Sequence, residues 1–188
     1  MTKLTANEIA TESRASIDKR ELEELLLILE NRKFSNVVEI GVHRGCSLEV
    51  WSKAFSPDIL LGIESDPSQL DINLISKVPN ATVIPFSSQS EQALSALRLR
   101  FGQPASPKID FLFLDGDHHY DAVKADFELC SAFLGAQAVV VFHDIRIQQE
   151  GVEVKDYWDQ VKVGYHYYEI YNQVVGTGIG VLFIGEKQ

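Results

Sequence analysis

The sequence predicts an α/β fold in which helices cover both faces of a doubly wound, mostly parallel sheet of seven strands. Three observations lead to this prediction. Short apolar runs alternate with helical segments along most of the chain, which is the pattern of successive β-then-α units. The apolar runs are nearly continuous, as expected for strands that are buried on both faces. The last two runs are separated only by a turn-rich segment and predict a C-terminal antiparallel hairpin.

The first 34 residues are expected to be helical. A short helix is predicted at 6–13 and a longer one at 17–32, where four leucines at helical spacing form one apolar stripe: Leu22, Leu25, Leu26 and Leu29. Five buried strands are predicted at 37–42, 59–64, 81–85, 109–114 and 138–142. Helices are predicted between and after them at 47–55, 68–77, 90–101, 122–134 and 154–162. The terminal hairpin is predicted to use strands at 165–171 and 179–184.

The composition is that of one globular domain. The 188 residues are 45% hydrophobic and 23% charged, which excludes disorder of the whole chain. No apolar run approaches the roughly 20 residues that span a bilayer, and no signal peptide is readable. Cys46 and Cys130 do not form a disulfide framework, so we expect a cytoplasmic protein without a membrane partner. The net charge of −10 argues against nucleic acid as a partner.

Ligands of open α/β sheets bind at the carboxyl ends of the strands, and these ends are unusually polar in this sequence. The first strand leads into a glycine-containing turn at 41–47, which lets a ligand approach the backbone. Glu39 lies inside that strand, where a carboxylate is costly unless it is paired, so we favour a functional role for it. Glu64 ends the second strand and suits a ribose diol. The alternative for its neighbours is that Ser65 or Asp66 caps the following helix.

The densest group of ionisable residues follows the fourth and fifth strands, at 115–121 and 143–144. Adjacent strands would bring Asp115 and Asp144 together, and a divalent cation such as Mg²⁺ would relieve the repulsion between the two carboxylates. His118, His119 and His143 add groups that titrate near neutrality. The alternative is that the loop histidines are solvated while Asp121 caps the next helix.

Four pieces of sequence together resemble class I S-adenosylmethionine-dependent O-methyltransferases: Glu-x-Gly-x-x-x-Gly-x-Ser at 39–47, Gly62–Pro67, Asp-Gly-Asp-His-His-Tyr at 115–120, and His143-Asp144. The nearest likeness is to the small cation-dependent branch (catechol- and caffeoyl-CoA-type) and to bacterial relatives that methylate sugars or secondary metabolites. The resemblance covers nearly the whole chain. It implies a Rossmann-like fold, with 1–34 as an N-terminal helical extension and 35–188 as the methyltransferase domain.

The resemblance implies S-adenosyl-L-methionine as cofactor and a small-molecule or sugar hydroxyl as acceptor. The residues implied to bind the cofactor are Glu39, Gly41, Gly45, Ser47, Glu64, Ser65, Gln89 and Asp115. Ser88-Gln89-Ser90 stands where relatives often have Gly-Asp-Ser. An acidic contact on the adenine side is therefore expected to be weaker, or to be replaced by Gln89.

Asp115 and Asp144 match metal ligands of the cation-dependent members, which implies Mg²⁺ or another divalent cation. The usual third ligand follows the second, and Ile145 occupies that place. His143 is the candidate substitute, although neighbouring residues of a strand point to opposite faces. Without a cation a general base is needed. The candidates for catalysis are Asp115, Asp117, His118, His119 and His143.

Two other functions remain open from the sequence. A dinucleotide-dependent oxidoreductase also uses a glycine turn, but the turn here is not G-x-G-x-x-G. A non-catalytic S-adenosylmethionine-binding protein is supported by Ile145. The late aromatic residues could face an acceptor, although core packing is favoured for them: Tyr157, Trp158, Tyr165, Tyr167 and Tyr168. The N-terminal helices are candidates for pairing in a homodimer.

Overall fold

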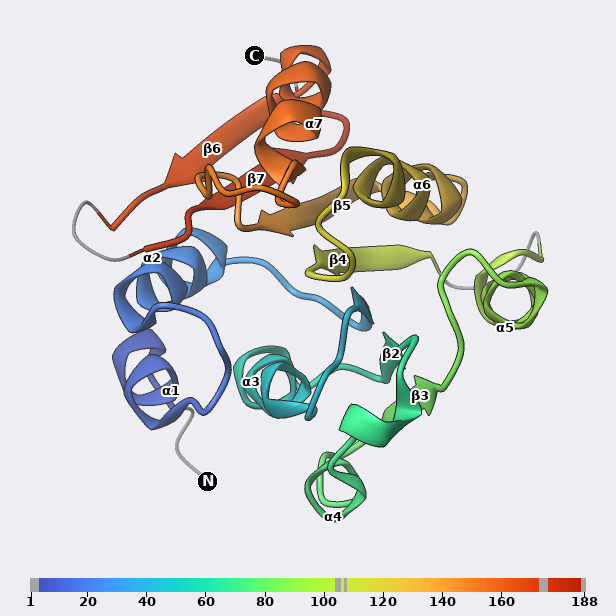
Figure 1. The fold of residues 1–188 in the computed structure, drawn as a ribbon. Helices are drawn as coiled ribbons and strands as arrows, with labels where there is room; N and C mark the ends of the chain where they lie inside the picture. The colour runs from blue at the N-terminus through green and yellow to red at the C-terminus, as the bar shows by residue number, and fades with distance from the viewer. Residues whose placement is uncertain (1–3, 104–105, 107, 173–175, 187–188) are drawn as a thin grey trace.

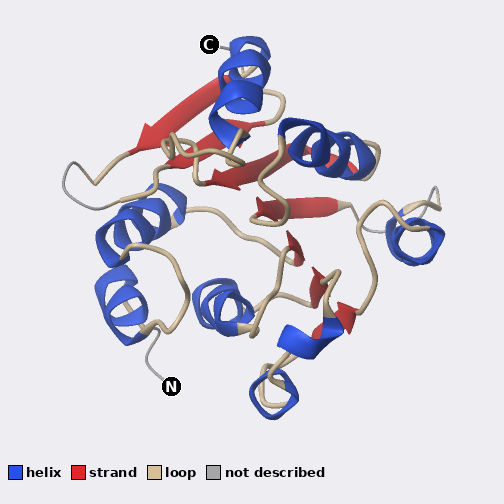
Figure 2. Ribbon diagram, in the orientation of Figure 1, coloured by secondary structure: helices blue, strands red, loops and turns tan. Residues whose placement is uncertain are grey.

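The structure, a computed structural model, describes residues 4–103, 106, 108–172 and 176–186. Its strands form one seven-stranded sheet in the order β3-β2-β1-β4-β5-β7-β6 (Figures 1 and 2). The pairings among β1 to β5 are parallel, whereas β7 is antiparallel to both β5 and β6. The predicted fold class is therefore confirmed. The strands are β1 Asn36–Ile40, β2 Ile59–Ile63, β3 Ala81–Ile84, β4 Ile109–Leu114, β5 Leu134–His143, β6 His166–Ile170 and β7 Ile179–Phe183.

The last strand lies between two strands that precede it in the sequence. β7 pairs with β5 from Val139↔Phe183 to His143↔Ile179, and with β6 from His166↔Phe183 to Ile170↔Ile179. Within the described residues β6 has no other strand partner, so it forms the edge of the sheet. The predicted hairpin is confirmed, and its second strand is the one that joins it to the parallel part of the sheet.

The helices begin and end close to the predicted positions, with three differences. The helix expected at 17–32 is shorter: Asp18 is its N-cap, and it ends at Leu29. The helix expected at 68–77 is divided into a 3₁₀ turn (Pro67–Gln69) and α4, because Asp66 and Asp71 each accept a backbone hydrogen bond and cap a separate segment. The helix expected at 122–134 ends earlier, and Leu134 already belongs to β5. The helices are α1 Ala6–Glu12, α2 Lys19–Leu29, α3 Cys46–Phe55, α4 Ile72–Ile75, α5 Glu91–Phe101, α6 Tyr120–Ser131 and α7 Val154–Val161, followed by a 3₁₀ turn at Lys162–Gly164.

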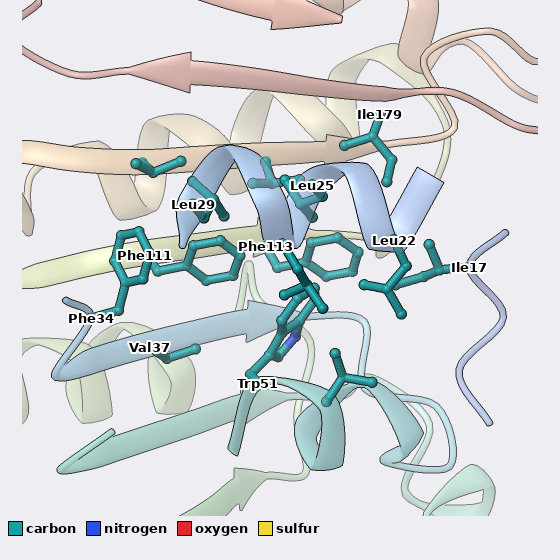
Figure 3. Packing of buried hydrophobic residues seen from close by; sticks show 14 of the residues in the cluster. Ile17, Leu22, Leu25, Leu29, Phe34, Val37, Trp51, Phe111, Phe113 and Ile179 are labelled. Atoms are coloured by element: carbon teal, nitrogen blue, oxygen red, sulfur yellow. The ribbon is translucent and has the colours of Figure 1, made fainter. Parts of the chain in front are cut away.

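Helices cover both faces of the sheet and bury two apolar layers. Figure 1 shows α1, α2 and α3 on one face, with α5, α6 and α7 on the other. On the first face the leucines of α2 pack over Phe111 and Phe113 of β4, and the ring of Trp51 from α3 lies 5.1 and 4.9 Å from these two rings (Figure 3). The predicted leucine stripe is thus part of the central core. None of the described helices has the length and apolar character that a membrane crossing requires.

Candidate active site

Two adjoining cavities open at the carboxyl ends of the parallel strands. The β2-side cavity, of about 490 Å³, lies beyond the ends of β1, β2 and β4 and reaches α6. The β5-side cavity, of about 610 Å³, lies beyond β1, β4 and β5 and reaches the segment between α1 and α2. Gly41, His43 and Asp115 line both cavities and mark the junction between them. A ligand with two chemically different halves could extend across this junction.

The junction depends on a close approach of two backbone segments. Gly41 has a φ of +89°, which favours glycine, and a Cβ placed on it would lie 2.0 Å from the carbonyl oxygen of Asp115. The turn after β1 therefore lies against the end of β4, with no room for a side chain between them. Gly45 also has a positive φ, of +88°, and is the N-cap of α3. Both predicted glycines thus shape the turn by which β1 leads into α3.

Glu39 lies beneath the β5-side cavity and lines neither cavity. It is 0% exposed, and its carboxylate accepts hydrogen bonds from the Ser47 hydroxyl and, at 3.1 Å, from the indole N–H of Trp51. Burial raises the pKa of Glu39 to about 8, and the nearby charges of Asp115 and Glu64 act in the same direction. Ser47 does line the β5-side cavity, so Glu39 reaches that cavity only through Ser47.

The raised pKa of Glu39 predicts that the protein without ligand becomes less stable as the pH rises from about 4.5 to about 8. In that window the folded state holds a proton that the unfolded state has released, so unfolding is favoured by up to about 1.4 kcal/mol per pH unit. Glu39→Gln should remove this component of the slope. Urea unfolding of both proteins at several pH values measures it, and parallel stability curves would contradict the prediction.

Glu64 follows β2 and lines the β2-side cavity together with Ser65 and Gln89, two other residues expected from the sequence to bind the cofactor. Its carboxylate accepts backbone hydrogen bonds from His43 at 2.7 Å and from Asp66 at 2.8 Å. These bonds hold the side chain at the junction while each oxygen keeps further acceptor capacity for a ligand. Asp66 caps the following turn by accepting the N–H of Ser68, so of the two candidates for the cap, Ser65 and Asp66, the structure uses Asp66.

Four ionisable side chains converge on the floor of the β5-side cavity: Asp115, His118, His143 and Asp144. The Nε2 of His118 lies 2.7 Å from Oδ2 of Asp144, and the Nδ1 of His143 lies 2.9 Å from Oδ1 of Asp115. His143 was expected to point away from Asp144, and this expectation is wrong, because its Nδ1 lies 3.2 Å from Oδ1 of Asp144. β5 ends at His143, and the next residue, Asp144, has a φ of +62°. The rule that successive side chains of a strand point to opposite faces therefore does not apply to this pair.

His143 forms a buried charged group with its neighbours. Burial alone would lower its pKa, but the charges and hydrogen bonds of Asp115 and Asp144 outweigh this effect and raise the pKa to about 10. The pKa of Asp144 is lowered despite its own burial, through hydrogen bonds from His118 and His143. The Nε2 of His143 lies 3.1 Å from the Thr177 hydroxyl, so both of its ring nitrogens are engaged. His143 therefore holds the cluster together.

The two loop histidines have different surroundings. His118 is partly exposed to the β5-side cavity, and its hydrogen bond to Asp144 raises its pKa. His119 pairs with Asp117 at 2.6 Å, and both side chains are more than 60% exposed. Asp117 lines the β2-side cavity, whereas His119 lines neither of the two cavities. The N-cap of α6 is His119 and not Asp121, and Glu153 accepts the N–H of Tyr120 in the first turn.

The donor set at the end of β4 and β5 fits a divalent cation. Ligand atoms of Asp115, His118 and Asp144 lie within 4.8 Å of one another. Oδ1 of Asp144 is buried, and apart from the approach of His143 Nδ1 at 3.2 Å no hydrogen-bond partner for it lies among the described residues. Ile145 is an apolar core residue, so the candidate for a third donor is His118 and not the position after Asp144. Carboxylate oxygens suit Mg²⁺ or Mn²⁺, and an imidazole nitrogen adds affinity for transition metals.

Two polar residues at the cavities were not predicted from the sequence. Asp126 of α6 is buried and lines the β2-side cavity, and its signal was a carboxylate on the same helix face as Val123, Phe127 and Cys130. Thr177 precedes β7 and lines the β5-side cavity. Its position is fixed by Glu21 of α2, a buried carboxylate that accepts the N–H of Gly178 at 3.2 Å.

The aromatic residues considered for the acceptor line neither cavity. Tyr157 and Trp158 are buried in the core on the α7 side of the sheet. Tyr167 and Tyr168 are exposed on β6. The preference for packing is confirmed for the first two. The walls of the β5-side cavity are formed by apolar, polar and basic side chains, among them Ile17, Ile147, Cys46, Arg14 and Arg44.

Comparison with known proteins gives one family match and many similar folds. Residues 38–145 match the family model described as a methyltransferase domain. A 79-residue stretch is 35% identical to the uncharacterized protein y4gI of Sinorhizobium fredii (strain NBRC 101917 / NGR234). That stretch covers 42% of this chain and 8% of the relative, so the chain corresponds to a small part of that protein.

Solved structures share the fold along nearly the whole chain. The O-methyltransferase TomG from Streptomyces achromogenes, which is involved in tomaymycin synthesis and was solved with SAM, has a TM-score of 0.66 at 18% identity, over 98% of this chain and 92% of that chain. The MycE methyltransferase of the mycinamycin biosynthetic pathway was solved with Mg, SAH and mycinamycin VI. It has a TM-score of 0.62 at 16% identity, over 96% of this chain and 54% of that chain. At such identities the likeness concerns the fold.

Proposed function

Because the chain belongs to the methyltransferase domain family that its residues 38–145 match, we propose that it transfers a methyl group from S-adenosyl-L-methionine to a hydroxyl oxygen of a small molecule. The observation that carries the proposal is the junction at Gly41, His43 and Asp115. On one side of it a buried carboxylate, Glu64, faces the β2-side cavity. On the other side lies the cluster of Asp115, His118, His143 and Asp144, which can handle a proton or hold a cation.

The two cavities suit the two halves of this cofactor. Glu64 accepts the ribose hydroxyls, and Ile40 and Ile63 supply apolar surface for the nucleoside in the β2-side cavity. The methionine portion extends across the junction into the β5-side cavity, where Ser47 offers a hydroxyl. The absence of a side chain at Gly41 lets the turn after β1 lie against Asp115, and this contact forms the junction that the cofactor would cross. We therefore assign the remainder of the β5-side cavity to the acceptor.

S-adenosylmethionine supplies the methyl group as an electrophilic sulfonium. The chain's task is to hold the acceptor oxygen in line, about 3–3.5 Å from the methyl carbon, and to accept its proton. His118 is the base within reach, because it faces the cavity and Asp144 orients its ring, as a carboxylate does in a catalytic triad. If a divalent cation is bound, Asp115, His118 and Asp144 would hold it, and it would lower the pKa of the acceptor hydroxyl.

Thermal unfolding in the presence of ligands tests the cofactor assignment. S-adenosylmethionine and S-adenosylhomocysteine should both raise the melting temperature, by an amount that corresponds to about 2.7 kcal/mol at a concentration of 100 Kd. NAD should not raise it, and a shift with NAD alone would support the oxidoreductase instead. Methyl transfer to a panel of hydroxyl compounds, with EDTA and then with Mg²⁺, separates the cation route from the histidine route. Cofactor binding without any transfer would favour the non-catalytic protein.

Glu64→Gln is expected to weaken S-adenosylhomocysteine binding by about 10- to 100-fold. The substitution removes the charge that strengthens the hydrogen bonds from the ribose, and such bonds contribute about 1.5–3 kcal/mol. Isothermal titration calorimetry measures the change, with Glu91→Gln as a control at an exposed carboxylate of α5 that lines neither cavity. An unchanged Kd for Glu64→Gln would contradict the assignment of the ribose hydroxyls to Glu64.

A further inference from the structure

Asp126 is a buried carboxylate that the proposed reaction leaves unused. It belongs to α6, is 3% exposed and lines the β2-side cavity. Its Oδ1 accepts the hydroxyl of Ser88, and its Oδ2 lies beside Gly116, 3.2 Å from where a Cβ on that glycine would be. No basic side chain of the described residues pairs with it. A buried carboxylate is costly unless hydrogen-bond donors satisfy it. Ser88 supplies one donor to Asp126, and the β2-side cavity that Asp126 lines is where a further donor could come from.

The position of Asp126 in the cavity identifies the part of a ligand that it would meet. Glu64 is bonded to the N–H of His43, a junction residue, so it stands at the end that leads to the β5-side cavity. Asp126 and Ser88 line the β2-side cavity and not the β5-side one. An adenosyl group whose sulfonium lies at the junction and whose ribose lies at Glu64 has its base in the rest of the β2-side cavity, where Asp126 supplies a buried carboxylate.

The hydrogen-bonding groups at this end of the β2-side cavity distinguish one purine base from another. An ionised carboxylate only accepts hydrogen bonds, and the Ser88 hydroxyl already donates to Asp126, so this end of the cavity presents acceptors. Adenine carries a donor, its exocyclic amino group, whereas hypoxanthine carries a carbonyl oxygen at the same position. Burial raises the pKa of Asp126 to about 6, so the group is ionised at and above neutral pH.

Building on the proposed function, we propose that Asp126, positioned by Ser88, accepts a hydrogen bond from the exocyclic amino group of adenine and so selects adenosyl ligands over other purine nucleosides. The sequence analysis considered Gln89 for this contact, in the loop after β3. Gln89 does line the cavity but is exposed. The structure brings a buried carboxylate to the same end of the cavity from another element, α6.

Two ligands that differ only at this group test the proposal. Wild type should bind S-adenosylhomocysteine at least about 10-fold more tightly than S-inosylhomocysteine, because the inosyl carbonyl would face an acceptor and leave both groups unsatisfied. Asp126→Asn should lose about 10-fold in affinity for the adenosyl ligand and most of the preference, since the amide can donate to the inosyl oxygen. Asp121→Asn, an exposed carboxylate one turn earlier on α6, should behave as wild type.

The outcomes separate this proposal from the proposed function. Equal affinity of wild type for the two ligands, or an unchanged preference in Asp126→Asn, overturns the role of Asp126 and leaves the methyltransferase assignment standing. Failure of wild type to bind either ligand overturns both. If Asp126→Asn does not fold, as judged by its melting curve, the wild-type comparison decides together with Ser88→Ala, which should reduce the preference by at least about threefold.

Discussion

Asp144→Asn is expected to lower kcat for methyl transfer by about 10²- to 10⁴-fold, the range that a positioned acid–base group contributes. Oδ2 of Asp144 lies 2.7 Å from His118, and its other oxygen lies 3.2 Å from the buried His143. An amide in this place no longer holds His118 as a base, and it offers a poorer ligand to a cation. The loss is therefore expected whether or not a metal takes part.

The same substitution should leave cofactor affinity within about threefold of wild type, because Glu64 and Ser47, the side chains assigned to the ribose and the methionine portion, have other hydrogen-bond partners than Asp144. Single-turnover rates and calorimetric Kd values for S-adenosylhomocysteine give the two quantities separately. Asp58→Asn, at an exposed position before β2, is the matched control. Turnover near the wild-type rate in Asp144→Asn would mean that the cluster is structural.

Gly41→Ala is expected to reduce the free energy of unfolding by more than about 3 kcal/mol. A non-glycine residue at positive φ costs about 1–2 kcal/mol, and the new Cβ would overlap the carbonyl oxygen of Asp115 at 2.0 Å, which forces the turn and β4 apart. Cofactor binding should fall as well, because the displaced turn forms the junction of the two cavities.

The chain contains a control for the conformational part of this effect. Gly151 has a φ of +83°, yet nothing lies within 4 Å of a Cβ placed on it. Gly151→Ala should therefore cost only about 1–2 kcal/mol. Urea unfolding measures the loss of unfolding free energy in both variants. The difference between the two losses is the cost of the overlap between the turn and β4, without the cost of the backbone angle. Equal losses would show that the backbone relaxes around the new methyl group.

The sequence predicts the positions of the helices and strands better than it predicts which strands pair with one another. Strands such as Ile109–Leu114 are recognised because a short apolar run between two helical segments is typical of a buried parallel strand. The insertion of β7 between β5 and β6 does not follow from any local pattern, since pairing is decided by the whole sheet. The division of the helix around Leu70 was missed because Asp66 and Asp71 are both competent caps, and the pattern does not say that both are used.

The site divides in the same way. Glu64, Asp115 and Asp144 could be found from the sequence because strand ends of a parallel sheet meet at one edge. The contact between His143 and Asp144 could not, because it depends on the positive φ of Asp144, which is unusual for a residue other than glycine. Asp126 was missed for a third reason: it is a helix residue, and only the placement of α6 against the sheet brings it to the cavity.

The late insertion of β7 also sets an order for synthesis on the ribosome. β6 emerges before the strand that joins it to the sheet, and the antiparallel side of β5 stays uncovered until β7 follows. Thr177 reaches His143, and Gly178 reaches Glu21, only at that point, although Glu21 was made 157 residues earlier. A nascent chain that ends before β7 therefore exposes an apolar strand edge and lacks one wall of the β5-side cavity. Chaperone binding to the nascent chain should be concentrated in the interval between the emergence of β5 and the emergence of β7.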